Sequence, residues 1–215
     1  MIKNRALPLL ALLAVTPLLP ACAPILLGGA AVSGVMLYSD RRTSGAQVED
    51  QSIENKAAKQ IHALIGDRGH VSAVSYNRIA LLTGEVPTEA DRAAIEKSVA
   101  GIENLRSVVN EIAVMTSSTL TSRSNDLLLT SKVRATFLDA GSFEGKAFKL
   151  VTERGTVFLM GRVTAAEADR AAELARSVSG VQKVVRVVEL ISPEELRALQ
   201  STTAPANAPQ TAPRP

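Results

Sequence analysis

The chain has 215 residues, of which 46% are hydrophobic and only 3% aromatic, with 24 basic and 21 acidic side chains. The formal net charge of +3 is small, so the overall balance does not indicate a nucleic-acid-binding protein. The chain has one cysteine, which excludes an intramolecular disulfide.

The first segment has the order of a secretory signal. Lys3 and Arg5 precede an uncharged run from Ala6 to Ala21, and a basic start followed by an apolar stretch is typical of exported proteins. The run ends at Leu19-Pro20-Ala21-Cys22, which resembles a lipobox, although Pro20 differs from the small residues more common there. We therefore predict a signal peptide at residues 1–21 and lipidation of Cys22.

A transmembrane anchor is the alternative for this segment, because the chain carries no charge from Ala6 to Ser39 and about 20 apolar residues span a bilayer. Prolines at positions 8, 17, 20 and 24 interrupt any single helix there, which favours cleavage. Cleavage leaves 22 basic and 21 acidic side chains, so the mature chain is nearly neutral. Ala23 stands where an inner-membrane retention aspartate could follow Cys22, which favours a lipid anchor in the outer membrane facing the periplasm.

The two ends of the expected mature chain have little hydrophobic pattern. Residues 22–49 are predicted to be a lipidated tether that ends in a polar linker from Asp40 to Gly45. Residues 193–215 are predicted to be a disordered tail, because their larger part, Thr202 to Pro215, is Ala/Pro/Thr-rich, almost uncharged and unable to bury enough surface to fold.

Between these ends the sequence repeats itself. Leu82-Thr83-Gly84-Glu85-Val86 in the first copy corresponds to Met160-Gly161-Arg162-Val163 in the second. In each copy an alanine-rich helical pattern, a glycine and a β-branched strand follow, at residues 88–94, 101 and 108–114 and at residues 166–172, 180 and 184–188. We predict a diverged duplication, with domains at residues 50–116 and 117–192, and expect Gly101 and Gly180 to end their helices in the left-handed conformation.

Upstream of each motif the pattern predicts a helix and a β-hairpin. The expected helices cover about Asp50–Ile65 and Asn125–Asp139. Their core stripes are Ile53, Ala57, Ile61, Leu64 and Ile65 in the first, and Leu129, Val133 and Phe137 in the second. Strands at 71–76 and 79–86, and at 148–152 and 157–163, are joined at Asn77-Arg78 and Arg154-Gly155. The predicted class is α+β, with two tandem αββαβ two-layer sandwiches.

These residues resemble the BON domain, a repeat of bacterial envelope proteins. The resemblance lies in the Leu-Thr-Gly-x-Val and Met-Gly-x-Val strand ends, the alanine-rich helix and the glycine before the last strand, and it covers about Asp50 to Ser192. Segments Thr130–Arg134 and Val151–Gly161 are especially similar to dual-BON outer-membrane lipoproteins. The resemblance implies an envelope lipoprotein that binds anionic phospholipid through its second BON domain and supports outer-membrane integrity.

The sequence offers little for catalysis. Its two histidines are His62 and His70, Cys22 is taken by the lipid, and no carboxylate cluster has the spacing of metal ligands. No glycine-rich phosphate-binding loop is present. We expect a non-enzyme with no catalytic residue, no metal and no cofactor, and turnover that is lost on mutating His62 or His70 would indicate otherwise.

The charge is distributed unevenly between the copies. Residues 50–116 carry 7 basic and 9 acidic side chains, whereas residues 117–192 carry 11 and 8. The first helix of the basic copy also places Leu127 and Leu128 off the core stripe, with Lys132 and Arg134 on the same faces. The candidate phospholipid-binding residues are therefore Leu127, Leu128, Lys132 and Arg134.

The alternative is that both leucines pack on the other repeat, with the two cations as ordinary solvated charges. Related BON lipoproteins carry an aromatic residue where Leu128 stands, so membrane affinity through this position is expected to be weaker here. The expected partners are a membrane, reached through the acyl chains on Cys22, and anionic phospholipid, but not nucleic acid. The alternative function is a periplasmic scaffold or chaperone-like lipoprotein that binds envelope-assembly proteins.

Overall fold

The computed structural model describes residues 40–141 and 145–203, and side chains up to residue 199. The expected signal peptide, Cys22 and most of the tether lie outside the described residues. The described part begins at Asp40, the first residue of the predicted polar linker.

The first repeat has the predicted αββαβ order. It consists of α2 (Ser44–Ile65), the short 3-10 helix η1 (Gly66–Arg68), β1 (His70–Tyr76), β2 (Ile79–Val86), α3 (Glu89–Ala100) and β3 (Ser107–Val114). The sheet order is β1-β2-β3. Strand β2 pairs antiparallel with β1 and parallel with β3, so the hairpin comes first and α3 crosses over to the third strand.

The second repeat has the same order and topology. It consists of α4 (Leu120–Asp139), the 3-10 helix η2 (Gly145–Ala147), β4 (Lys149–Glu153), β5 (Thr156–Val163), α5 (Ala165–Ser177) and β6 (Lys183–Leu190). Its sheet order is β4-β5-β6, again antiparallel and then parallel. The predicted α+β class and the duplication are thereby confirmed.

Each repeat has its own core between a pair of helices and one face of its sheet. Nearly all residues of the predicted helical stripes are buried there, with Ile53 and Val133 fully so. The first core consists of Ile53, Ala57, Ile61, Ile65, Ala80, Leu82, Val86, Ile95, Val99, Ile102 and Ile112. Leu64 is an exception, because its side chain is 40% exposed, and its prediction as a core residue was wrong.

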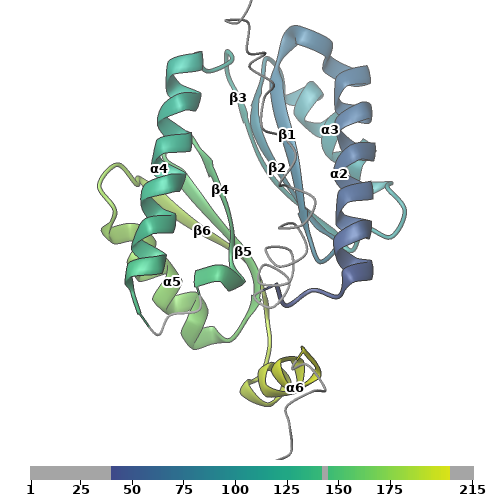
Figure 1. The fold of residues 1–215 in the computed structure, drawn as a ribbon. Coiled ribbons are helices and arrows are strands. Elements are labelled where there is room, and N and C mark those ends of the chain that lie inside the picture. The colour runs from purple at the N-terminus through teal and green to yellow at the C-terminus, as the bar shows by residue number, and fades with distance from the viewer. Residues whose placement is uncertain (1–39, 142–144, 204–215) are drawn as a thin grey trace, which may run out of the picture. The chain divides into compact units, whose positions relative to one another are not determined.

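The other faces of the two sheets pack against each other. Their shared cluster contains Tyr76 and Leu81 from the first repeat and Phe158, Met160 and Val187 from the second. Figure 1 shows the result: α2 and α3 lie outside one sheet, and α4 and α5 outside the other. The outward surfaces of the helices are therefore left free by the contact between the repeats.

The repeated glycine of the strand motif is explained by close packing of neighbouring backbone. A Cβ atom on Gly84 would lie 2.0 Å from the carbonyl oxygen of His70, and the φ angle there is +118°. On Gly161 a Cβ atom would lie 2.8 Å from the carbonyl oxygen of Ala147. Gly101 does not adopt the expected left-handed conformation, since its φ is −82°, and the positive φ of 65° occurs at Asn104. Gly180 has a positive φ of 102°, but α5 ends at Ser177 with Val178 as its C-cap, so Gly180 does not end the helix as expected.

The predicted ends of the folded region need correction. Helix α2 begins at Ser44, where Thr43 caps it through a hydrogen bond from Ala46 N, so part of the predicted tether and linker is helical. Helix α4 begins at Leu120, five residues before the expected start.

The segment expected to be a disordered tail begins with another helix, α6 (Pro193–Thr203). The Ser192 hydroxyl accepts a hydrogen bond from Glu195 N at 3.1 Å, proline is favourable at a first helical position, and two glutamates follow it. Glu195 also pairs with Arg162 at 2.7 Å. The cap at Ser192 and the residues of the first helical turn thus favour a helix, although the residues that follow are rich in Ala, Pro and Thr.

Candidate functional site

Helix α4 carries all four predicted site residues. Its N-cap is Thr119, whose hydroxyl accepts from Ser122 N, and its buried side is formed by Asp126, Leu129, Val133 and Phe137. These four positions recur every three or four residues and so lie on one side of the helix. Thr130, beside this buried side, still reaches the sheet, where its hydroxyl donates to the Thr152 hydroxyl of β4 at 2.7 Å.

The outward side of α4 is a row of exposed leucines, which we call the leucine face and define as Leu120, Leu127, Leu128 and Leu138. The side chain of Leu127 is 71% exposed and that of Leu128 is 62% exposed. The alternative in which these two leucines pack on the other repeat is therefore wrong. Four large apolar side chains on one side of a surface helix form a surface of the kind that binds a membrane or another molecule.

Lys132 and Arg134 are exposed at the borders of this face. At about 100° per residue they lie on opposite flanks of the leucine row, rather than together on one face as the sequence had suggested. Within the described part of the chain neither side chain forms an ion pair. Both cations are thus available to an anionic partner without breaking an internal contact.

Two serines lie among the leucines without making the face strongly polar. The Ser124 hydroxyl donates to the Leu120 carbonyl at 3.0 Å, and the Ser131 hydroxyl donates to the Leu127 carbonyl at 3.0 Å. A serine that bonds to the preceding turn of its own helix keeps its donor satisfied when water is removed. This lowers the cost of placing the leucine face in an apolar environment.

The first repeat provides an internal comparison. Asp50 of α2 accepts hydrogen bonds from Asn77 N and Arg78 N of the β1–β2 turn, both at 2.7 Å. Asp126 of α4 does the same for Arg154 N and Gly155 N of the β4–β5 turn, at 2.8 and 2.9 Å. The two aspartates are therefore structurally equivalent.

Counting from these aspartates, Leu127 and Leu128 correspond to Gln51 and Ser52 of α2. The same fold is thus built in the first repeat with polar residues at both positions. The two leucines are therefore not required by the fold.

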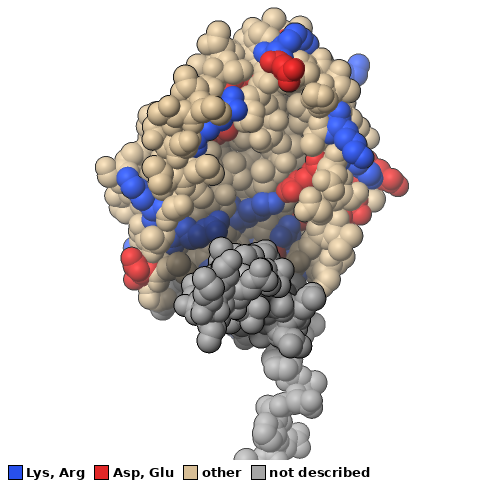
Figure 2. Space-filling model, turned by 45° about the horizontal axis from the view of Figure 1, so that its top comes forward, with Lys and Arg blue, Asp and Glu red and all other residues tan. Residues whose placement is uncertain are grey.

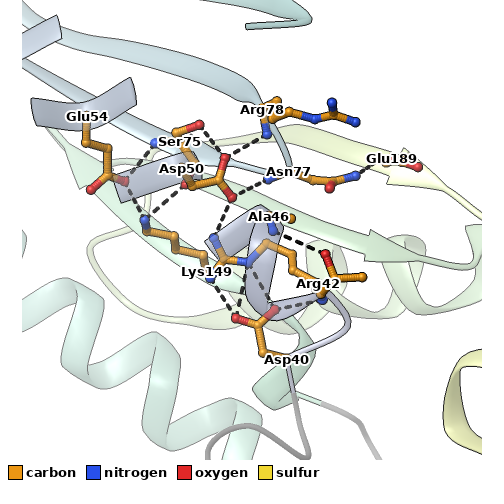
Figure 3. Close-up of polar contacts among 11 residues, drawn as sticks. Asp40, Arg42, Ala46, Asp50, Glu54, Ser75, Asn77, Arg78, Lys149 and Glu189 are labelled. Atoms are coloured by element: carbon orange, nitrogen blue, oxygen red, sulfur yellow. Dashed lines mark hydrogen bonds and ion pairs between the residues drawn. The ribbon is translucent and has the colours of Figure 1, made fainter. Parts of the chain in front are cut away.

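The end of the tether contacts both repeats, which the sequence did not indicate. Arg41 binds both carboxylate oxygens of Glu167 in α5, at 2.9 and 2.7 Å, and donates to the Arg162 carbonyl at 3.1 Å. Arg42 pairs with Asp40 and, at 2.7 Å, with Asp50 of α2, as Figure 3 shows. The segment Asp40–Arg42, called here the clasp, thus joins the repeats.

Further polar contacts between the repeats lie near Asp50 (Figure 3). Lys149 binds Glu54 at 2.8 Å, and the Asn77 side chain donates to Glu189 at 2.5 Å. Arg42 also lies over the Tyr76 ring, with its guanidinium carbon 4.4 Å from the ring centre. Together with the shared apolar cluster, these contacts fix the orientation of α4 relative to the first repeat.

Removing the Arg41 side chain should weaken the contact between the clasp and the second repeat. Burial by itself would raise the pKa of Glu167, but hydrogen bonds from Arg41 and Thr164 outweigh it and lower that pKa. We expect Arg41→Ala to lower the free energy of unfolding by about 1–2 kcal/mol, the usual value of a charge-assisted hydrogen-bonded pair. Urea unfolding measures this loss of stability. The control is Arg197→Ala, which removes an exposed ion pair with Glu194. Equal stability of the two variants would show that the contacts of Arg41 contribute nothing.

Both histidines lie in the first repeat. His62 is exposed on α2 and His70 is half-buried at the start of β1. Burial and the nearby Arg123 lower the pKa of His70. Within residues 40–141 and 145–203, no three His, Cys, Asp or Glu side chains come together as a metal site, and Cys22 lies outside the described residues.

The face of the molecule drawn in Figure 2 carries mixed rather than uniformly basic charge. Figure 2 shows a face on which Lys and Arg lie beside Asp and Glu, with broad uncharged areas around them. No helix in the described part of the chain is long and apolar enough to cross a membrane.

Comparison with known proteins agrees with the repeat structure. Residues 49–116 and 125–191 each match the BON domain family. The chain is 34% identical over 182 residues to the outer membrane lipoprotein DolP of Haemophilus influenzae, an alignment that covers 84% of this chain and 94% of DolP. It is 32% identical over 154 residues to the 21 kDa hemolysin of Actinobacillus pleuropneumoniae, covering 71% of this chain and 79% of that protein.

Among solved structures, CdsD, a structural protein of the type III secretion system of Chlamydia trachomatis, aligns with 66% of this chain and 96% of its own. The identity is 13% and the TM-score 0.24, so this similarity says nothing further about the chain. The similarity to DolP agrees with the expected outer-membrane location. The chain therefore belongs to the BON-domain family and is one of its dual-BON outer-membrane lipoproteins similar to DolP.

Proposed function

We propose that this protein is a non-enzymatic lipoprotein, anchored through Cys22, that binds anionic phospholipid through α4 of its second BON domain and thereby supports outer-membrane integrity. The observation that carries the proposal is the leucine face, flanked by Lys132 and Arg134, which form no ion pair with any residue that the structure describes. Leucines enter the acyl boundary and cations meet lipid phosphates, the arrangement by which helices lie at membrane surfaces.

The expected strength of this contact is modest. Each basic residue near an anionic surface contributes about 1 kcal/mol, and each leucine about 1–2 kcal/mol when it is partly withdrawn from water. The sum for Leu127, Leu128, Lys132 and Arg134 is about 4–6 kcal/mol, comparable to the marginal binding by one myristoyl chain. The face alone therefore binds reversibly, and the anchor makes the contact persistent by holding the face at the membrane.

Vesicle flotation tests the proposal. A mature chain with Cys22→Ser, which removes the acyl anchor, is mixed with vesicles of phosphatidylethanolamine with or without phosphatidylglycerol. We expect it to float with the phosphatidylglycerol vesicles and to dissociate as salt is raised, because exposed charges are screened.

Absence of binding to the anionic vesicles would contradict the proposal. Recovery of envelope-assembly proteins by the Cys22→Ser chain from lipid-free extract, without vesicle binding, would favour the scaffold function instead.

A further inference from the structure

Strand β6 has a free edge among the residues that the structure describes. The order of its sheet is β4-β5-β6, so β5 pairs with only one edge of β6. The Val163 carbonyl of β5 accepts a hydrogen bond from Ile191 N, just after β6. Because backbone groups alternate along a strand, the odd-numbered residues of β6 bond to β5. The even-numbered residues direct their N–H and C=O groups outward; they are Val184, Arg186, Val188 and Leu190.

The corresponding edge of the first repeat is closed, whereas that of β6 is open. The Asn110 side chain of β3 accepts a hydrogen bond from Ile112 N at 3.1 Å, which covers an outward N–H group. Arg186 occupies the position of Asn110 in β6. An arginine side chain cannot accept a hydrogen bond, and no backbone group of residues 40–141 and 145–203 other than those of β5 bonds to β6.

The open edge is also largely apolar. Strand β6 contains four valines, and the Leu190 side chain at its end is 63% exposed. Edge strands of soluble proteins are commonly protected from pairing by charged side chains, prolines or bulges. The charged residue in the middle of β6, Arg186, is instead held against α5 by its ion pair with Asp169. Such an edge can accept another extended chain.

We propose that β6 pairs with β6 of a second copy of this chain, antiparallel and about a two-fold axis that passes through Val187. A closed dimer with the same surface on both copies has such an axis. The outward residues of the two strands then meet, as an antiparallel ladder requires. Arg186 exchanges backbone hydrogen bonds with Val188 of the second copy, and Val184 exchanges them with Leu190 of the second copy.

The side chains favour this register. Leu190 lies opposite Val184 of the second copy, on the side of the sheet where Val184 packs against the core under the helices, so its exposed apolar surface is covered. The exposed Lys183 lies diagonally opposite Glu189 of the second copy. The alternative axis through Arg186 places two arginines directly opposite each other, and like charges in such a pair are destabilising.

Pairing of this kind keeps the helices of both copies on the same side. The two-fold axis is perpendicular to the sheet, and Figure 1 shows α4 and α5 together on one face of that sheet. The leucine faces of both copies therefore point in the same direction. If the leucine face binds lipid as proposed above, both copies contact one membrane, a consequence that rests on the proposed function.

Pairing through a single strand edge is expected to be weak in solution, because it buries less than the roughly 1,000 Å² that a stable interface needs. Anchoring through Cys22 raises the effective concentration of the copies at the membrane, so the dimer is expected where the protein is dense. With lipid in large excess the bound chains are far apart, and variants of the leucine face then report on single chains.

Sedimentation equilibrium from micromolar to millimolar concentration tests the pairing without lipid, in the mature chain with Cys22→Ser. The variants compared are Arg186→Pro and Arg186→Ala. Both lose the ion pair with Asp169, but only proline removes the outward N–H group, a position at which an edge strand tolerates it.

We expect Arg186→Ala to dimerise like the unmodified chain. Arg186→Pro should dimerise about 30-fold more weakly, because each copy loses one hydrogen bond to the other. Equal association of the two variants, or monomers at every concentration, would overturn the proposal. Because no lipid is present, either result leaves the proposed lipid binding untouched.

Amide hydrogen exchange covers the case in which Arg186→Pro does not fold. It is followed by NMR at low and high concentration of the chain whose single change is Cys22→Ser. We expect the amides of Arg186 and Val188 to be protected at high concentration, and the outward amide of Val108 in β3 to exchange equally at both. Exchange at Arg186 and Val188 that does not depend on protein concentration contradicts the dimer.

Discussion

Glutamate in place of both Leu127 and Leu128 is expected to reduce the partitioning of the unlipidated protein onto anionic vesicles by about 100-fold. The substitutions remove two leucines from the lipid contact and add two negative charges near an anionic surface. Loss of the two leucines alone costs about 3 kcal/mol, which corresponds to that factor, and the added negative charges act in the same direction. Because both side chains are more than half exposed in the free protein, stability should change little.

The control for this double variant is Val48→Glu with Leu190→Glu. These two side chains are 71% and 63% exposed, so the control makes the same changes in apolar surface and charge away from α4. Sedimentation with vesicles at several lipid concentrations gives both partition coefficients. Equal losses in the two double variants would mean that net charge, not the leucine face, governs membrane binding.

Asp50→Ala is expected to lower the free energy of unfolding by about 3–5 kcal/mol, the cost of leaving buried charged and polar groups without their partner. Asp50 is 2% exposed. It accepts from Arg42 at 2.7 Å, from the Ser75 hydroxyl at 2.6 Å and from two turn amides. Chemical unfolding measures the loss.

The control is Asp67→Ala, which removes an exposed carboxylate of η1 and should change stability by less than about 0.5 kcal/mol.

The pKa of Asp50 also predicts how the stability of the protein depends on pH. Burial would raise its pKa, but hydrogen bonds from Ser75, Arg78 and Arg42 outweigh burial and lower it. Its contribution is therefore complete above the ordinary pKa near 4 and is lost as the pH falls through the lowered value. If Asp50→Ala were as stable as the unmodified chain at pH 7, the hydrogen-bond network around Asp50 would be dispensable.

Most of the fold could be predicted because each element carries its own pattern. Strand β2 has the predicted bounds, Ile79–Val86, and the helical stripes are buried apart from Leu64. The clasp could not be predicted in this way. Arg41 reaches Glu167, 126 positions along the chain, and a short polar run in the sequence is indistinguishable from a linker until its partner is known.

The site residues could be proposed from the sequence, but their exposure could not. Leu127 and Leu128 lie off the core stripe of α4, and whether they face solvent depends on which surfaces the repeats use against each other. The structure shows that the repeats pack through their sheets, so the helices remain outside. The contacts of the buried Glu85 with Arg154 and Ser118 could not be predicted for the same reason, since these partners belong to the second repeat and the segment before it.

Binding of lipid by the outward side of α4 can be tested most directly with a probe within the leucine face. Because Cys22 is the single cysteine of the chain, Cys22→Ser with Ser131→Cys places one label there and retains all four leucines. Asn55→Cys labels the equivalent position of α2. On phosphatidylglycerol vesicles that carry a quencher in their acyl chains, we predict quenching of the label at position 131 and little at position 55. Equal quenching at both positions, or none at 131 while the protein is bound, would contradict the proposed function.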